Sequence, residues 1–238
     1  MAPWKVRSMN IPNAQTQVLP PIDGLAVEWI DRRPIDRWGA VFKEVTDRGL
    51  GALLLVGALP ILLVAALAIK LESQGPLLYR QRRHALDNRV FHIYKFRTMA
   101  WQSATPQASL EQTQRNDHRI TRVGRWLRAT SIDELPQLLN VLRGEMSLVG
   151  PRPLAVEMRT EGLYCHEISQ RYAHRHRVKP GMTGWAQVHG SRGATHTCDE
   201  LAQRVRFDLE YIERWSPWLD FKILLMTVRV VVQGTNAF

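Results

Sequence analysis

The segment GLGALLLVGALPILLVAALAIKL, residues 49–71, decides the fold of this chain. Residues 49–69 form a run of 21 amino acids without a charge, and no other stretch of the 238 residues compares with it. A helix rises about 1.5 Å per residue, so a run of this length just reaches across a hydrocarbon core of roughly 30 Å. The segment is therefore predicted to enter a membrane as a helix.

Two features of this segment favour a helix that enters the membrane and returns to the same side. Pro60 lies at its middle, where it removes a backbone hydrogen bond and clashes with the carbonyl of Val56. Two arms of about ten residues would each be too short to span. Both flanks are basic, whereas a spanning helix usually has its Lys and Arg excess on one side. We therefore predict a re-entrant helix–break–helix hairpin at 46–72 with its break at Pro60. A Pro-kinked spanning helix is the alternative.

The rest of the chain is predicted to be mostly α-helical with a small β-hairpin, an α+β fold. Residues 1–45 contain scattered prolines and are predicted to form a flexible tail and a short polar lead-in helix. The alternating strand at 90–94 follows the turn residues Asp87 and Asn88, which together predict the hairpin. Residues 101–117 are polar and predict a loop.

Two further regions, residues 118–130 and the C-terminal region from residue 201 onward, have the amphipathic pattern of helices that lie at a membrane interface. Residues 118–130 place apolar side chains on one face and arginines on another, although an ordinary surface helix would show the same pattern. Residues 201–215 repeat apolar side chains at the spacing of a core helix. Trp215 and Trp218 then precede an apolar run that predicts a half-immersed helix.

The charge of the chain indicates an anionic partner. The formal net charge is +10, with 32 Lys and Arg against 22 Asp and Glu. Nucleic acid, an acidic lipid surface and a phosphorylated substrate all fit this excess. Neither the two cysteines nor the histidines have the spacing of a zinc site, and no P-loop, Ser-His-Asp order or Rossmann fingerprint is present. The choice among anionic partners therefore depends on other motifs.

The segment SIDELPQLLNVLRGEMSLVGPRP, residues 131–153, has the densest set of reactive side chains. Ser131 or Asp133 is expected to cap a helix that Gly144 ends. Asp133 and Glu134 would then lie at the positive end of the helix dipole. Acidic residues are common there for that reason alone, so this pair is not sufficient to indicate a site.

The surroundings of this acidic pair point to phosphate chemistry. Four arginines lie shortly upstream, between residues 119 and 128. Downstream, Arg152 stands between two prolines, which hold the backbone so that its guanidinium can bind a phosphate through paired hydrogen bonds. Carboxylates beside phosphate donors are typical of a site where Mg²⁺ joins the two. The second carboxylate would then be free to attack phosphorus.

Several ordered motifs resemble the bacterial sugar transferase family, the monotopic phosphoglycosyl transferases, in a short form. They are KFRTM (95–99), NDHRITRVGRWLRATSIDELPQLLNVLRGEMSLVGPRP (116–153), VKPGMTGWAQVHG (178–190) and FDLEYIERWSPWLDFKILLMTV (207–228). The resemblance extends from about residue 46 to the C-terminus. It implies a monotopic membrane protein whose residues 73–238 form a catalytic domain with interfacial helices, at the cytoplasmic face of the bacterial inner membrane.

The resemblance also implies a two-step reaction with Mg²⁺. A UDP-sugar would give a phosphosugar–enzyme and UMP, and polyprenyl (undecaprenyl) phosphate would then take the phosphosugar to begin a capsule, exopolysaccharide or other glycan. Asp133 would be the nucleophile, and Glu134 would help to bind Mg²⁺. Arg152 would contact a phosphate, and Lys95 and Arg97 would line the same cationic pocket.

Further residues and partners follow from the same resemblance. The stretch 180–187 would help to form the nucleotide-sugar site through Thr183, Gly184, Trp185 and Gln187. The implied partners are the UDP-sugar, polyprenyl phosphate and the phospholipid bilayer, with a second copy of the chain as a candidate partner and no nucleic acid.

The chain departs from the family pattern at two places. Ala85 and Asn88 stand where family members commonly have glycines, and Ala85 adopts a left-handed turn less readily. Ser191-Arg192-Gly193 replaces the usual sequence after Gly190, so contacts to the sugar are not transferred to this loop. A glycosyltransferase that releases UDP and a non-catalytic basic membrane adaptor are the alternatives. The motifs do not select a particular sugar or glycan pathway.

Overall fold

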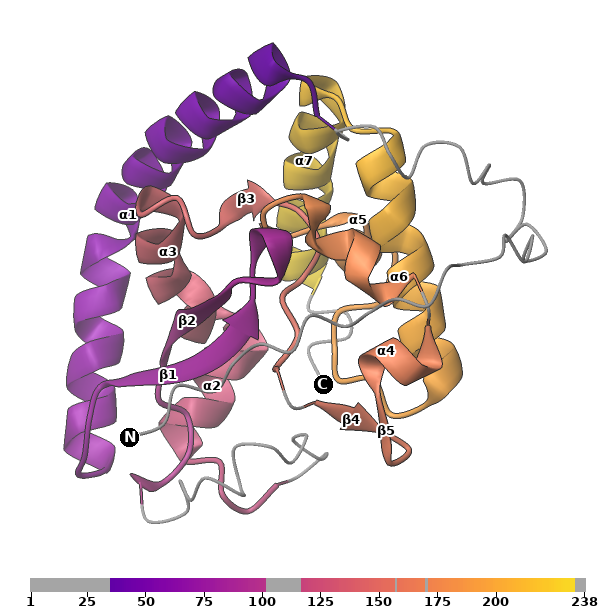
Figure 1. Ribbon diagram of the computed structural model, residues 1–238. Coiled ribbons are helices and arrows are strands. Elements are labelled where there is room, and N and C mark those ends of the chain that lie inside the picture. Colours follow the sequence, from indigo (N-terminus) through magenta and orange to yellow (C-terminus); the bar gives the residue numbers. More distant parts are fainter. Residues whose placement is uncertain (1–34, 102–116, 157, 170, 234–238) are drawn as a thin grey trace, which may run out of the picture. The chain divides into compact units, whose positions relative to one another are not determined.

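The computed structural model describes residues 35–101, 117–156, 158–169 and 171–233 (Figure 1). Its helices are α1 (Arg37–Glu72), α2 (Arg122–Thr130), α3 (Leu138–Leu142), α4 (Cys165–Ile168), α5 (Trp185–Val188), α6 (Cys198–Glu213) and α7 (Pro217–Gln233). Its strands are β1 (Leu78–His84), β2 (Val90–Phe96), β3 (Ser147–Val149), β4 (Arg159–Thr160), β5 (Leu163–Tyr164) and β6 (Gly181–Thr183). The prediction of a mostly helical chain with little β-structure is confirmed. The predicted tail and the 101–117 loop lie largely outside the described residues.

Helix α1 contains the apolar segment and has the length and composition to cross a membrane. It extends over 36 residues, and the Asp36 carboxylate accepts a hydrogen bond from Gly39 N at 2.8 Å to cap its first turn. Leu53 and Leu63 are each 69% exposed, which is far more than a core helix of a soluble domain allows. An apolar surface of this extent is typical of a helix that contacts lipid.

The predicted break at Pro60 is not present in α1. The helix is continuous from Arg37, so the predicted lead-in helix is also part of it. A proline within a helix removes one hydrogen bond and commonly bends the helix without ending it. Figure 1 shows α1 changing direction part-way along its length. The expectation of two separate arms was therefore wrong, and the return of the chain to one membrane face stays a prediction.

The predicted hairpin is confirmed as the antiparallel pair β1–β2, in register from Leu78 opposite Phe96 to His84 opposite Val90. Its turn uses Asp87 and Asn88 at φ of 55° and 58°. Ala85, by contrast, has a φ of −110°, so the absence of a glycine there causes no strain. Ala85 therefore replaces the glycine of the family pattern without a structural cost.

Helix α3 holds the β1–β2 hairpin beside the segment that immediately precedes α3. Asn140, which is fully buried, donates to His92 O at 2.8 Å and accepts from Tyr94 N at 3.1 Å. These paired bonds hold β2 beside the 3₁₀ segment Ile132–Gln137. Strand β2 thereby brings Lys95 to the acidic pair.

A parallel pair, β3–β6, was not predicted. Ser147 pairs with Gly181 and Val149 with Thr183, which brings two distant motifs together. Glycine is required at 181, where a Cβ atom would lie 2.1 Å from Gly150 N, and at 184, where it would lie 2.2 Å from Gly150 O. This close approach determines where the chain leaves β3 and so where Arg152 lies.

The first half of α1 is joined to the C-terminal helices by buried polar contacts. Lys43 Nζ lies 2.6 Å from Asp220 of α7, and Leu148 N of β3 donates to Asp47 at 3.1 Å. Tyr211 of α6 donates to Asp220 at 2.7 Å and lies 3.1 Å from the carbonyl of Val149. The helix that holds the apolar segment is thus connected directly to the strand that leads to Arg152.

The two predicted amphipathic regions are helices in the structure. The core spacing in α6 is confirmed by four buried side chains, Leu201, Val205, Leu209 and Ile212. Helix α2 buries Leu127 and exposes Trp126 by 54%, and α7 exposes Trp218 by 70%. Exposed tryptophans suit the headgroup region, but placement of these helices at a membrane interface stays a prediction.

Candidate active site

Asp133 and Glu134 lie in the 3₁₀ segment Ile132–Gln137, which begins after a sharp turn. Ser131 forms that turn with a φ of 59°, and its side chain does not cap the helix, nor does that of Asp133. The expectation of a side-chain cap was therefore wrong. Pro136 lies inside this segment and lacks the N–H that a regular helix would use. Gly144, with a φ of 76°, follows α3 as predicted.

Glu134 is held by two cations. Lys95 Nζ lies 2.7 Å from its Oε1, while Arg152 donates to Oε1 at 2.5 Å and to Oε2 at 3.1 Å. Burial acts to raise the pKa of Glu134, but Arg152 and Lys95 outweigh it and hold the pKa well below its usual value. Lys95, Glu134 and Arg152 thus lie together, and the fork of Arg152 binds a carboxylate in the paired manner that was expected for a phosphate. A contact of Arg152 with phosphate stays a prediction.

Asp133 has the opposite electrostatic character. Its side chain is buried, and burial together with the neighbouring Glu134 charge raises its pKa to about 6. The positive charges of Lys95, Arg128 and Arg152 lower the pKa but offset only part of this rise. At neutral pH the carboxyl is therefore mostly ionised, yet more basic than an ordinary aspartate. Two adjacent carboxyls with separated pKa values are typical of a site where they have different roles.

The upstream arginines do not all approach this pair. Arg128 is close enough for its charge to act on Asp133, and its Nε donates to Thr98 Oγ1 at 2.9 Å. Arg119 forms an ion pair with Asp117, at 2.6 Å. The cationic surroundings predicted from sequence therefore depend chiefly on Lys95, Arg128 and Arg152.

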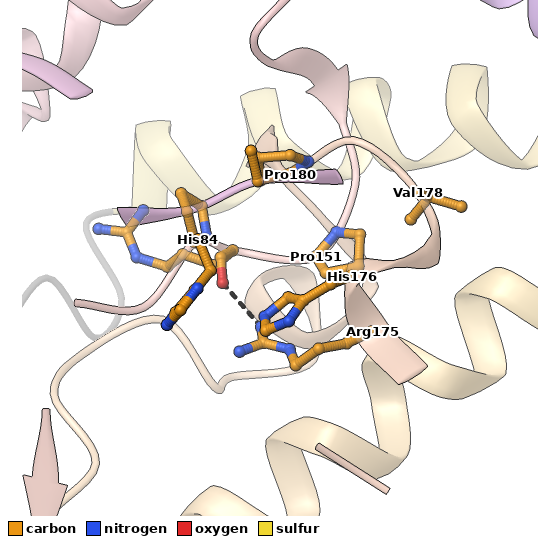
Figure 2. Close-up of a pocket in the computed structure, with 9 residues that line it drawn as sticks. His84, Pro151, Arg175, His176, Val178 and Pro180 are labelled. Atoms are coloured by element: carbon orange, nitrogen blue, oxygen red, sulfur yellow. Dashed lines mark hydrogen bonds between the residues drawn. The ribbon is translucent and has the colours of Figure 1, made fainter. Parts of the chain in front are cut away.

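An ion pair that the sequence did not predict holds the backbone of Arg152. Arg175 Nη2 donates to the carbonyl of Arg152 at 2.7 Å (Figure 2). It also donates to Asp208 at 2.5 Å, and the side chains of this ion pair are each 1% exposed. Arg83 Nη1 also donates to Pro153 O, at 3.0 Å. The sequence YAHRH at residues 172–176 has the composition of a basic surface stretch, but Arg175 is buried. The spacing of charges alone gave no signal of its burial.

The cavity in Figure 2 lies beside this backbone and is lined by His84, Arg175 and His176 among others. Its volume of about 10 Å³ leaves room for a water molecule at most. Burial lowers the pKa of His176 to about 3, so its ring is neutral at physiological pH. Arg175, which lines the cavity, holds the backbone of Arg152, and the cavity is too small to contain a nucleotide or a sugar.

Arg97 lies away from the cationic pocket. Its guanidinium donates to Ser73 O at 2.8 Å and to Gln74 O, beyond the end of α1. The expectation that it lines the same pocket as Lys95 was therefore wrong. Strand β2 ends at Phe96, so the alternation of side chains that would have aligned the two residues stops before Arg97.

The predicted nucleotide-sugar stretch mainly contacts its own neighbours. Thr183 Oγ1 lies 2.7 Å from Thr227 Oγ1, and Gln187 donates to Met182 O at 3.1 Å. Gly184 packs against Gly150, while Trp185 contacts His189 with ring centroids 4.0 Å apart. These contacts support β6 and its pairing with β3, the strand that leads to Arg152. A role of the stretch in binding a nucleotide sugar stays a prediction.

A magnesium ion fits this site as a partner shared between protein and substrate. Oε2 of Glu134 accepts one hydrogen bond, from Arg152, and a carboxylate oxygen has two lone-pair directions. Within the described ranges, no group of three His, Cys, Asp or Glu side chains is placed to hold a metal. Mg²⁺ needs no such group where substrate phosphates complete its shell. Glu134 would then be the protein ligand, with Asp133 beside it.

A helix with the length and composition to cross a membrane is thus joined to a site where carboxylates and cations lie in close contact. The chain belongs to the bacterial sugar transferase family, whose model matches residues 38–234.

Three curated relatives illustrate this membership. The chain is 51% identical over 209 residues to the undecaprenyl-phosphate glucose phosphotransferase of Komagataeibacter xylinus, covering 88% of this chain and 39% of the relative. It is 52% identical over 196 residues to the UDP-glucose:undecaprenyl-phosphate glucose-1-phosphate transferase of Caulobacter vibrioides, covering 82% and 72%. It is 45% identical over 190 residues to the exopolysaccharide production protein PSS of Rhizobium leguminosarum, covering 79% and 94%. The chain thus spans about two fifths of the first relative and most of the other two.

Proposed function

We propose that this chain transfers a sugar-1-phosphate from a UDP-sugar to undecaprenyl phosphate, with release of UMP. The observation that carries the proposal is the buried Asp133, with a pKa of about 6, beside a Glu134 whose charge is offset by Lys95 and Arg152. The relatives named for UDP-glucose support this donor class and make UDP-glucose the first sugar to test. Family membership supports the same reaction class.

Asp133 is the proposed nucleophile. Its carboxylate attacks the phosphorus next to the sugar, and the bond from that phosphorus to the UMP oxygen breaks, with the electron pair leaving on UMP. An oxygen of undecaprenyl phosphate then attacks the same phosphorus, which releases Asp133 as a carboxylate and forms undecaprenyl-diphosphate-sugar. The cations around Glu134 offset the repulsion between a carboxylate and an anionic diphosphate.

Glu134 and Arg152 have supporting roles in this proposal. Arg152 binds phosphate oxygens with a fork that Lys95 complements as a point charge. A magnesium ion held through Glu134, when bound, would supply further charge neutralisation on the phosphates. The carbonyl of Arg152 is fixed by Arg175, so its guanidinium approaches the substrate from a constant direction.

The proposed location is the cytoplasmic face of the bacterial inner membrane. Helix α1 would anchor the chain in the bilayer, where undecaprenyl phosphate is dissolved, and the site would face the water-soluble UDP-sugar. The relative named for exopolysaccharide production supports a role in starting such a polymer. A homodimer is kept as a candidate assembly.

The proposal is tested by identifying the nucleotide that is released and the covalent adduct that forms on the protein. Purified protein with Mg²⁺, undecaprenyl phosphate and a panel of UDP-sugars should release UMP with at least one donor. Without the lipid, intact mass should rise by one phosphosugar on the peptide that contains Asp133. Asp133→Asn should form no adduct, and Glu134→Gln should slow its formation steeply and weaken the dependence on metal.

Other outcomes would replace this proposal. Release of UDP would indicate a glycosyltransferase, and release of neither nucleotide would favour a basic membrane adaptor. An adduct on another residue would remove Asp133 as the nucleophile but leave the reaction class in place.

A further inference from the structure

The loop at 190–193, where the chain departs from the family pattern, reaches the candidate active site. Arg192 donates a hydrogen bond from its guanidinium to Ser131 Oγ. Ser131 is the turn residue that immediately precedes the 3₁₀ segment with Asp133. The loop and the acidic pair are therefore neighbours, although about 60 residues separate them in the sequence.

The backbone on both sides of Arg192 is held in place by α6. Arg204, which is 3% exposed, donates from Nε to Ser191 Oγ at 3.2 Å and from Nη2 to Gly193 O at 2.6 Å. A buried arginine that binds the residues before and after position 192 restricts the loop backbone. The direction in which the Arg192 side chain leaves the loop is thereby determined by the fold.

Arg192 differs from Lys95 and Arg152 in its partner. Lys95 and Arg152 both form ion pairs with Glu134, whereas no carboxylate of the described chain pairs with Arg192. Its hydrogen-bond partner is a neutral hydroxyl, and the side chain is only partly buried. Partial burial lowers the pKa of Arg192, while the charges of Glu134 and Asp133 oppose this and that of Arg152 adds to it.

A guanidinium in this position is suited to an anion that arrives from solvent. It has five N–H donors in a planar fork, and a hydroxyl oxygen uses few of them. A phosphate accepts two parallel, charge-assisted hydrogen bonds from the same fork, which are about twice as strong as neutral ones. A phosphate near Ser131 would therefore displace the hydroxyl as the partner of Arg192.

We propose that Arg192 is a substrate-binding residue that binds a phosphate of the nucleotide, and that its guanidinium exchanges the Ser131 hydroxyl for this phosphate when the nucleotide arrives. The inference rests on the proposed function and adds an arginine from a loop far along the chain to the cations near Asp133. Arg152 and Lys95 would keep the roles proposed above, while Arg192 would hold a phosphate of the nucleotide.

The test is nucleotide binding by the purified full-length chain, with UMP as the probe in a calorimetric titration. Arg192→Gln should weaken UMP binding about ten- to a hundredfold, the usual range for losing charge-assisted hydrogen bonds. The affinity of Arg192→Lys for UMP should lie between that of the wild type and that of Arg192→Gln, because the positive charge remains without the planar fork. Ser131→Ala should bind UMP at least as tightly as the wild type, since the competing contact is removed. The KM for the UDP-sugar should rise with Arg192→Gln while the KM for undecaprenyl phosphate stays constant.

The matched control is Arg214→Gln. Arg214 is an exposed arginine after α6 that pairs with Glu210 at 2.6 Å, so its loss changes net charge equally without approaching the site. Unfolding midpoints of all variants should stay close to that of the wild type. UMP affinity of Arg192→Gln within twofold of wild type would overturn the inference, as would a change confined to the KM for the lipid.

The two proposals fail in different ways. If the wild type releases UMP from a UDP-sugar and Arg192→Gln binds UMP normally, the inference fails and the proposed function stands. If the wild type transfers no phosphosugar but Arg192→Gln still weakens UMP binding, the proposed reaction fails and the nucleotide-phosphate contact stands.

Discussion

Replacing Asp133 by Asn should make the protein more stable at neutral pH while removing its proposed nucleophile. In the folded chain the pKa of Asp133 is about 6, above its ordinary value of 3.8, because burial and Glu134 disfavour the charged form. The folded state therefore holds this proton more tightly than the unfolded state does. Its contribution to stability is complete below about pH 4 and is lost as the pH rises through about 6.

The magnitude follows from the pKa difference. Each pKa unit is worth about 1.4 kcal/mol, so ionisation of Asp133 costs the folded state about 3 kcal/mol by neutral pH. About 2 kcal/mol of this should accrue between pH 4.5 and 7.5. Because 1 kcal/mol shifts the unfolding midpoint of a domain of this size by about 2–4 °C, the midpoint difference between Asp133→Asn and wild type should widen by about 4 °C or more over that range.

The assay is tryptophan fluorescence during heating, at a series of pH values, in one detergent. Asp117→Asn is the control with the opposite sign, because hydrogen bonds from Arg119 lower the pKa of Asp117 to about 2 and its charge stabilises the fold. That variant should be less stable than wild type at neutral pH. A midpoint difference for Asp133→Asn that is constant with pH, or that narrows as the pH rises, would refute the reasoning.

Three further predictions concern activity and topology. The kcat/KM for UMP release should fall on the acid side with an apparent pKa of about 6, as Asp133 becomes protonated; a flat profile from pH 5 to 8 would contradict this. Arg152→Lys should lose most activity yet purify normally, because lysine offers only a point charge in place of the fork that is proposed to bind phosphate oxygens; near-normal turnover would show that the fork is unnecessary. With a re-entrant anchor, Ser8→Cys and Thr235→Cys in a cysteine-free background should resist an impermeant thiol reagent in intact cells and react after lysis. Labelling of Ser8→Cys in intact cells would establish a spanning helix.

Local patterns in the sequence predicted local structure well. The hairpin followed from the alternation at 90–94 and from residues that tolerate a left-handed turn, and both are present. The buried face of α6 followed from helical spacing. Such patterns depend on neighbours within one turn or one strand, where the physics of backbone conformation and burial acts at short range.

Contacts between distant segments could not be predicted in the same way. Strands β3 and β6 have three residues each, too few for a periodic pattern, and their pairing depends on the approach of Gly181 to Gly150. Arg175 looked exposed because neighbouring residues are charged, and only its pairing with Asp208, 33 residues later, allows its burial. Arg97 was misplaced because the exact end of β2 determines which way its side chain points.

The sequence by itself predicted a long apolar helix that could enter a membrane, a mostly helical fold and one motif that contains Asp133, Glu134 and Arg152. These properties follow from composition and from spacing over a few residues. The tertiary structure alone decided that Lys95 and Arg152 both bind Glu134, that Asp133 has a raised pKa and that Arg192 reaches Ser131. Electrostatic character depends on burial and on distances between charges, and both are set only when segments far apart in the chain pack together.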